Sequence, residues 1–274
     1  MIELAVSDAY CRRLAASHYE NFWVLAAVPS GPIRTHLARI YAYCRYTDDL
    51  GDETGADAER LLMAWRATVG DWLGELPTDH LVLIALGETV RSLQLPAEPF
   101  LDLIDANLQD QRVRAYDSWP QLRAYCLKSA APVGRLVLRV FGAWSPEAER
   151  LSDDVCLGLQ LANFAQDVSV DRAKGRTYLL GRDVEALGTR GATRRMCERA
   201  AGLLASGHEL EAMVPRRLRL QLALYRLGGE AILDAVRAAG YATEAERPVV
   251  SSLMKLRLVA SAAKQLSLSR AAGG

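Results

Sequence analysis

Two short stretches of this chain each place a pair of aspartates one helical turn apart. The first pair is Asp48 and Asp52, and the second is Asp167 and Asp171. Residues four apart share one face of a helix, so each pair would project its carboxylates in the same direction. Carboxylates held that close repel each other unless a cation lies between them. The pattern therefore predicts two helices, each with a cation-binding face.

The rest of the chain favours a helical fold. Apolar residues recur at intervals of three and four, and no convincing alternating strand is present. We expect Ser7 or Asp8, Ser118 and Ser145 to cap helices, and Thr243 with Glu246 to form a capping box. We predict one all-α domain over residues 1–274. Its helices are expected over these approximate ranges: 7–28, 33–50, 59–73, 80–93, 99–112, 119–128, 132–142, 146–168, 194–213, 215–240 and 245–269. Residues 175–188 are expected to be irregular or to form a short helix.

Composition narrows the class of protein. The chain carries 33 basic and 33 acidic side chains, so we expect no nucleic-acid partner. Five scattered cysteines without a CxxC pair predict reduced thiols in the cytoplasm. Residues 1–30 lack the pattern of a signal peptide, and no stretch approaches about 18 uninterrupted apolar residues. We therefore expect neither secretion nor a spanning helix.

Each aspartate pair extends into a longer polar stripe on its helix. Asp48 and Asp52 share a face with Tyr41 and Arg45, and Asp167 and Asp171 share one with Gln160 and Asn163. Such a stripe costs free energy if it is buried without partners, but it suits a cavity that holds metal ions and an anion. Oxygen ligands favour Mg²⁺, which commonly bridges carboxylates and phosphates.

Three residues that follow the second stripe strengthen this interpretation. Lys174, Arg176 and Tyr178 could bind phosphate oxygens. The alternative is an ordinary basic loop beside solvated helix faces, where acidic pairs form surface salt bridges. A plain helical scaffold explains neither stripe.

Both stripes lie in longer runs with a family resemblance. The run 41–53, YAYCRYTDDLGDE, resembles the first aspartate-rich signature of squalene and phytoene synthases. The runs QLANFAQDVSVD (160–171) and GRTYL (175–179) resemble the second, and YCLKSAAPVG (125–134) resembles the mid-chain motif. The similarity covers residues 10–264, nearly the whole chain.

Within that family, the run His18-Tyr19-Glu20-Asn21-Phe22 is similar to bacterial hydroxysqualene synthases of hopanoid biosynthesis. Two positions depart from the expected pattern. Ala131 stands where that subfamily would carry Asn, and Leu180 stands where a proline usually follows the leucine of the second signature. Neither departure touches the aspartates.

The resemblance implies a single-domain, all-α, isoprenoid-synthase-type bundle with a central cavity. It implies that Mg²⁺, with Mn²⁺ as an alternative, is bound by Asp48, Asp52, Asn163, Asp167 and Asp171. Tyr41 and Arg45 would position the diphosphate of a polyprenyl substrate. Members of the subfamily convert presqualene diphosphate to hydroxysqualene and diphosphate, so no NADPH is expected, and no glycine-rich dinucleotide motif is present.

The fate of the carbocation must depend on residues outside the stripes. Aromatic faces can stabilise a cation, and Tyr19, Phe22, Tyr41 and Phe164 are candidates, although core packing is the more common explanation for any one of them. A bound water must attack the final cation. His18, Tyr19, Glu20 and Asn21 are the candidates to hold it, with His18 more often structural than catalytic in such a position.

Two alternatives remain open from the sequence. One is a condensing synthase that makes presqualene diphosphate, squalene or phytoene, and the other is an inactive helical relative that acts in assembly or binding. An apolar substrate also predicts contact with the inner face of the membrane, assisted by Arg12, Arg13, Arg216, Arg217 and Arg219. Other enzymes of a hopanoid pathway are the expected protein partners.

Overall fold

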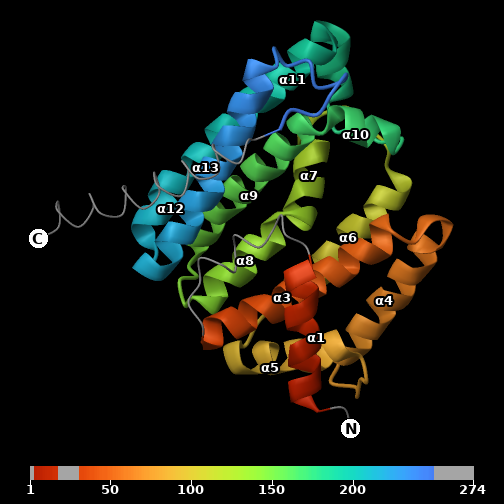
Figure 1. Cartoon of the computed structure of the whole chain (residues 1–274), viewed down its shortest axis with the longest axis vertical. Helices are drawn as coiled ribbons and strands as arrows, with labels where there is room; N and C mark the ends of the chain where they lie inside the picture. Colours follow the sequence, from red (N-terminus) through yellow and green to blue (C-terminus); the bar gives the residue numbers. More distant parts are fainter. Residues whose placement is uncertain (1–2, 18–30, 250–274) are drawn as a thin grey trace, which may run out of the picture. The chain divides into compact units, whose positions relative to one another are not determined.

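The computed structural model describes residues 3–17 and 31–249. All regular elements in these ranges are helical, which confirms the predicted all-α fold (Figure 1). The elements are α1 (Leu4–Ser17), α3 (Pro32–Asp52), the 3₁₀ helix η2 (Gly55–Asp57), α4 (Ala58–Leu73), α5 (Leu81–Leu93), α6 (Glu98–Arg112), α7 (Trp119–Ser129), α8 (Ala131–Val140), α9 (Pro146–Gln166), α10 (Val168–Ala173), α11 (Gly181–Ala205), α12 (Gly207–Met213) and α13 (Arg216–Ala238).

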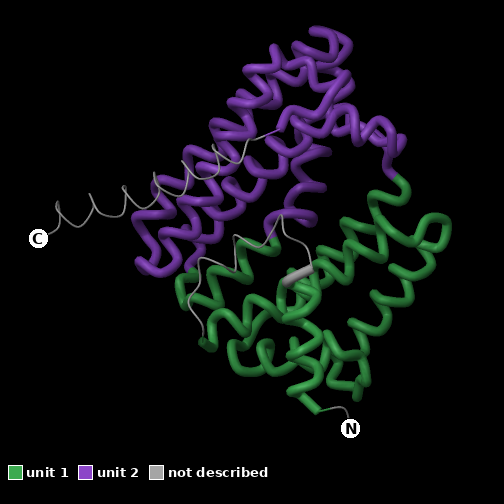
Figure 2. The backbone as a smooth tube through the Cα atoms, in the orientation of Figure 1, with its two compact units in different colours: residues 1–112, 132–144 green, residues 113–131, 145–274 purple. Residues whose placement is uncertain are grey.

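The helices form two compact units (Figure 2). Unit 1 comprises residues 1–112 with 132–144, and unit 2 comprises residues 113–131 with 145–274. Each unit contains one of the two aspartate stripes. The assignment of the whole chain to a single domain stays a prediction.

In unit 1, α3 is the central helix and contacts α1, α4, α5 and α6. Its buried face is anchored by aromatic side chains. The hydroxyl of Tyr43 donates to the Phe100 carbonyl at 2.8 Å, and the two rings meet edge to face. The indole of Trp65 donates to Thr47 Oγ1 at 3.0 Å. These bonds satisfy the polar atoms of a buried face, and so fix the rotation of α3 and the direction of its opposite, polar face.

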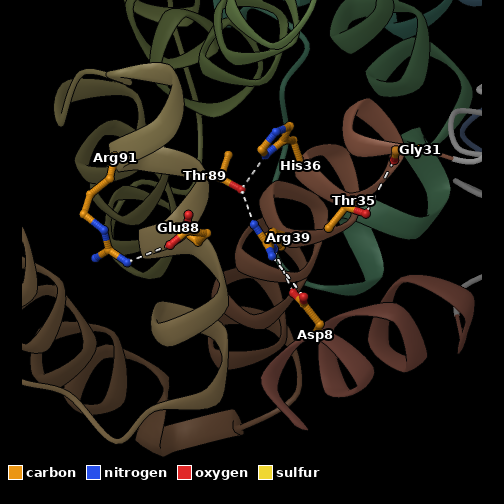
Figure 3. Close-up of polar contacts among 8 residues, drawn as sticks. All are labelled: Asp8, Gly31, Thr35, His36, Arg39, Glu88, Thr89 and Arg91. Carbon is orange, nitrogen blue, oxygen red and sulfur yellow. Dashed lines mark hydrogen bonds and ion pairs between the residues drawn. The ribbon is translucent and has the colours of Figure 1, made fainter. Parts of the chain in front are cut away.

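A buried polar cluster ties α1, α3 and α5 together (Figure 3). The guanidinium of Arg39 on α3 donates to both carboxylate oxygens of Asp8 on α1, at 2.7 and 2.9 Å. It also donates to Thr89 Oγ1 on α5, which lies 2.9 Å from Nδ1 of His36. Burial and the neighbouring Arg39 lower the pKa of His36, which favours its neutral form. A buried arginine with this many partners is a structural tether.

In unit 2, α9 is the central helix and contacts α7, α10, α11, α12 and α13. Close packing of α9 on α11 depends on Gly158, because a Cβ there would lie 3.1 Å from the Ala200 carbonyl oxygen. The side chain of Arg226 on α13 is 2% exposed and pairs with Glu211 at 2.7 Å and Glu230 at 2.9 Å. The core of unit 2 therefore combines glycine-mediated helix contacts with a fully paired buried charge.

Several predicted helix ends are confirmed and others are wrong. Ser145 caps α9 by accepting the Ala148 N–H at 3.1 Å, and Gln121 accepts the Ser118 N–H at 3.1 Å in the predicted cap of α7. Ser7 and Asp8 do not cap α1, which begins at Leu4, because Ser7 is buried and Asp8 is paired with Arg39.

The C-terminal half differs most from the sequence prediction. One helix was expected over 194–213, but α11 already begins at Gly181, bends at Gly188 with φ of 69°, and ends at Ala205 before α12. Glycine has no Cβ and adopts this backbone conformation without strain, so the helix continues after the bend. Residues 243–245 form a turn and residues 246–249 are irregular, so the predicted capping box and a helix start at 245 are wrong. The remainder of that predicted helix lies outside the described residues.

Within the described ranges, no helix is both long enough and apolar enough to cross a membrane.

Candidate active site

The first aspartate stripe lies on the last turns of α3. The helix runs without a break through Asp52, and the Glu53 N–H still donates to the Asp49 carbonyl at 3.0 Å. Asp48 and Asp52 therefore occupy successive turns of a regular helix, as the spacing predicts. Both residues are exposed, whereas Tyr41 and Arg45 are partly buried.

This position is unfavourable for negative charge. The C-terminus of a helix carries a partial negative charge, and α3 ends with three aspartates followed by Glu53. Arg45 offsets part of the repulsion by pairing with Asp49 and, at 2.8 Å, with Glu53. The predicted diphosphate ligand Arg45 thus holds the flanking carboxylates in this structure. A helix end that is costly for stability is a feature of functional sites.

Asp48 has a hydrogen-bond partner on α6. Asn107 Nδ2 donates to Asp48 Oδ1 at 3.2 Å and to the Leu103 carbonyl at 3.0 Å. The Asp48 side chain touches solvent, yet the surrounding protein atoms desolvate it enough to raise its pKa to about 6. The amide of Asn107 and the charge of Arg45 act in the opposite direction.

The second stripe crosses the junction between α9 and α10. Asp167 has non-helical dihedrals, with φ of −98° and ψ of 18°, so α9 ends at Gln166, two residues before the predicted end at Val168. The hydrogen-bond ladder nevertheless continues: Asp167 N–H donates to the Asn163 carbonyl and Asp171 N–H donates to the Asp167 carbonyl, both at 2.8 Å. The spacing of Asn163, Asp167 and Asp171 therefore survives the junction. Asn163 is exposed, while Gln160, Asp167 and Asp171 are partly exposed.

The turn after α13 folds onto this junction. Arg247 pairs with the Asp167 carboxylate and lies 3.4 Å from Gln166 Oε1. Gln166 Nε2 donates to the Pro248 carbonyl at 2.7 Å, and the Ser169 N–H donates to the Thr243 carbonyl at 3.1 Å. A segment about 80 positions away in the chain thus fixes the orientation of Asp167.

The three residues after the second stripe have different environments. Lys174 is exposed, and Arg176 lines a cavity of unit 2. Tyr178 is buried, and its ring stacks on Phe164 with centroids 3.8 Å apart and planes at 7°. The buried rings of Tyr116 and Tyr125 complete a four-ring cluster with Tyr178 and with Phe164, which is next to Asn163 on α9.

Three residues beside the stripes were not predicted from the sequence, namely Asn107, Gln111 and Arg247. Asn107 and Gln111 lie four apart on a correctly predicted helix, and Gln111 donates to the Gly51 carbonyl at 3.2 Å, so their spacing was a usable signal. Arg247 gave no local signal, since it was placed inside a helix. The candidates His18, Tyr19, Glu20, Asn21 and Phe22 lie outside the described residues.

The donor atoms fit a hard divalent cation, although the described residues contain no group of three or more His, Cys, Asp or Glu side chains that could hold a metal ion by themselves. Each unit instead supplies a pair of carboxylates, with an amide or a guanidinium that orients one member. Pairs of oxygen ligands that leave positions for water or phosphate are typical of Mg²⁺ sites.

Comparison with known proteins places the chain in a family. The sequence profile of Squalene/phytoene synthase matches residues 14–254, which include both aspartate stripes. The chain belongs to the squalene/phytoene synthase family. A chloroplastic phytoene synthase from Daucus carota is 28% identical over 194 residues, which are 67% of this chain and 48% of that protein. The phytoene synthase of Synechocystis is 27% identical over 197 residues, 58% of its length. This family member thus spans about half the length of these relatives.

Solved structures agree with the assignment. Squalene synthase HpnC from Alicyclobacillus acidocaldarius is 44% identical, with a TM-score of 0.81 over 88% of this chain and 97% of that one. A dehydrosqualene synthase solved with a ligand has a TM-score of 0.86 at 20% identity, over 96% and 98% of the two chains, a likeness that concerns the fold alone. The isoprenoid-synthase-type fold of this family member is therefore established.

Proposed function

We propose that this family member converts presqualene diphosphate to hydroxysqualene and diphosphate in a Mg²⁺-dependent reaction. The carbon–oxygen bond breaks with its electrons leaving on the diphosphate, the carbocation rearranges, and water adds with loss of a proton. The observation that carries the proposal is the pair of carboxylate stripes: the first lies on a regular helix, and the second keeps its hydrogen-bond ladder across the junction of α9 and α10. The 44% identity to a squalene synthase HpnC supports the choice within the family.

In this proposal Asp48, Asp52, Asn163, Asp167 and Asp171 bind Mg²⁺, which neutralises the departing diphosphate when it is bound. Asn107 and Arg247 orient one carboxylate of each stripe. Arg45, Lys174 and Arg176 add positive charge for the phosphate oxygens. Tyr41 contributes a hydroxyl and Gln160 an amide to the substrate site, whereas the buried Tyr178 contributes its stacked ring.

The hydrocarbon part requires an apolar environment that excludes bulk water. Phe164 and Tyr178 supply stacked aromatic surface in unit 2. His18, Tyr19, Glu20, Asn21 and Phe22 stay candidates for the site that holds the attacking water and shapes the tunnel. No reductant enters this reaction, so NADPH is not expected to be needed.

The decisive assay supplies presqualene diphosphate and Mg²⁺ without NADPH and identifies the lipid product by mass spectrometry. Hydroxysqualene together with released diphosphate is the expected result. Consumption of farnesyl diphosphate combined with no turnover of presqualene diphosphate would instead establish a condensing synthase. The phytoene synthase relatives make that reaction the second candidate.

An inactive relative would behave differently again. Its in vivo phenotype would survive the replacement of Asp48 and Asp167 by Asn, whereas an enzyme requires both.

Contact with the inner face of a membrane and with other hopanoid-pathway enzymes stays a prediction. A flotation assay that leaves all the protein in the soluble fraction would count against the membrane part.

A further inference from the structure

A buried hydroxyl group lies in the mid-chain motif 125–134. The Oγ atom of Ser129, at the end of α7, has no hydrogen-bond partner among the described residues. Hydroxyls on helices can donate to the carbonyl four residues earlier, as those of Thr68 and Thr193 do at 3.1 and 3.0 Å. Ser129 does not form this bond with the Tyr125 carbonyl. Because a buried polar group without a partner costs free energy, such groups in folded proteins commonly bind water or a ligand.

The helical backbone is interrupted beside Ser129. α7 ends at Ser129 and α8 begins at Ala131, with Pro132 at its second position. Proline has no N–H, so Pro132 cannot pair with the Lys128 carbonyl four residues before it, as a continuing helix would require. A hydroxyl and a carbonyl on adjacent residues thus lie where the regular hydrogen-bond pattern stops. Groups of these two types can bind a water together, because a buried water needs at least two polar partners.

Ser129 shares a helix face with the aromatic cluster of unit 2. Tyr125 lies four residues before it on α7 and is 3% exposed. The centroid of the Tyr125 ring lies 5.7 Å from that of Tyr178 and 6.4 Å from that of Phe164. Helix α7 contacts α9, which carries Phe164 (Figure 1). The face of α7 that carries Ser129 is therefore the face that packs against the stacked rings.

The same rings adjoin the second aspartate stripe. Phe164 lies four residues after Gln160 and three before Asp167, so it shares a helix face with both. Aromatic surroundings stabilise a carbocation and exclude bulk water, and one hydroxyl among them leaves a position for a single water. Ser7 and Thr243 also have buried hydroxyls without a partner among the described residues, but neither lies on a helix face with these rings.

We propose that Ser129 is a positioning residue whose hydroxyl holds the water that captures the carbocation. This inference rests on the proposed function and assigns a residue to its last step. A lone pair of the water forms the new carbon–oxygen bond, and the resulting oxonium loses its proton to the diphosphate released in the first step. The step needs no oxidant or reductant. Residues 18–21 stay candidates for further partners of the same water.

The test supplies presqualene diphosphate and Mg²⁺ to the full chain and separates ionisation from water capture. Released diphosphate measures ionisation. The ratio of hydroxysqualene to hydrocarbon products, which form when the cation loses a proton instead, measures water capture. Ser129→Ala removes the hydroxyl and Ser129→Thr keeps one. The control is Ser152→Ala, which removes the hydroxyl of a buried serine on α9 in the same unit.

Ser129→Ala is expected to lower the ratio of alcohol to hydrocarbon about three- to tenfold, the effect of one lost hydrogen bond, while diphosphate release changes less than about twofold. Ser129→Thr should restore most of the ratio, and Ser152→Ala should leave it within about twofold of the wild type. The ratio does not depend on how much of the protein is folded, so a loss of stability alone does not change it.

The inference is overturned if Ser129→Ala keeps the wild-type ratio or if the two Ala variants change the ratio equally. In both cases the wild type still forms hydroxysqualene, and the proposed function stands. A wild type that forms no hydroxysqualene would instead overturn the proposed function, and the role of Ser129 with it.

Discussion

The two aspartate pairs have the same spacing but opposite surroundings. Asp48 lies on an uninterrupted 21-residue helix, is held by the neutral amide of Asn107, and has a pKa raised by desolvation to about 6. Asp167 lies at a break between two helices and is paired with the cation Arg247. One carboxylate is thus oriented without being neutralised, and the other is oriented by a charge.

This difference shows what a spacing pattern determines and what it leaves open. Four-residue spacing determines which carboxylates share a helix face. The groups that orient them come from positions 59 and 80 residues away, so they depend on packing.

Removing a carboxylate from either stripe should have the largest effect. We expect Asp48→Asn and Asp167→Asn each to lower kcat/KM at least about 100-fold, since each removes a proposed ligand of the Mg²⁺ that would neutralise the leaving group. Turnover of presqualene diphosphate is the measurement. Asp57→Asn and Asp234→Asn replace exposed aspartates in the same units and should keep near wild-type rates. Full activity in either stripe variant would remove that stripe from the site.

Removing the positive charge of Arg247 beside Asp167 should have the second-largest effect. Arg247→Gln is expected to lower activity or Mg²⁺ affinity about 10- to 100-fold, the range seen when a group that orients a metal ligand is lost. Arg247→Lys should recover part of the loss. Its control is Arg190→Gln, because Arg190 pairs with Glu244 in the same turn, at 3.6 Å, but not with Asp167. Equal effects of the two Gln variants would mean that the turn, not its contact with Asp167, matters.

Removing Asn107, the neutral partner of Asp48, should lower activity less and should change its pH dependence. Its hydrogen bond lowers the pKa of Asp48 against desolvation, so Asn107→Leu should raise that pKa further. The charged carboxylate would then be lost at a higher pH as the pH falls. We expect the acid limb of the pH–activity profile to move to higher pH, with a loss of activity at the optimum of less than about tenfold. Gln111→Leu leaves the Asp48 contact intact, so an equal shift there would contradict this role.

Removing the hydroxyl of Tyr178 should have the smallest effect. Tyr178→Phe keeps the ring that stacks on Phe164, so unfolding free energy should change by under about 1.5 kcal/mol and turnover only slightly. Denaturant unfolding and steady-state kinetics measure the two quantities. A large loss of turnover at unchanged stability would show that the hydroxyl, not the ring, is the functional part of Tyr178.

The helical class, most helix bounds and both stripes were predictable because they follow from local periodicity. The ion pair between Asp8 and Arg39 was not predictable. The side chain of Asp8 could cap a helix or form a buried ion pair, and only the packing decides between these roles. The position of Arg247 was unpredictable for a related reason: the turn at 243–249 is stabilised by bonds to α9 and α10, and its own sequence favours a helix. Asn107 and Gln111 were recoverable from their spacing.

The proposed function predicts that both stripes are needed to bind Mg²⁺ with diphosphate. Its most direct test is the thermal stabilisation produced by Mg²⁺ with inorganic diphosphate in the wild type, Asp48→Asn, Asp167→Asn and the double variant. A single shared site predicts that the wild type is stabilised, that each single variant loses nearly all of the shift, and that the double variant loses no more. Two independent sites would contradict the claim: each single variant would keep about half of the shift and the losses would add.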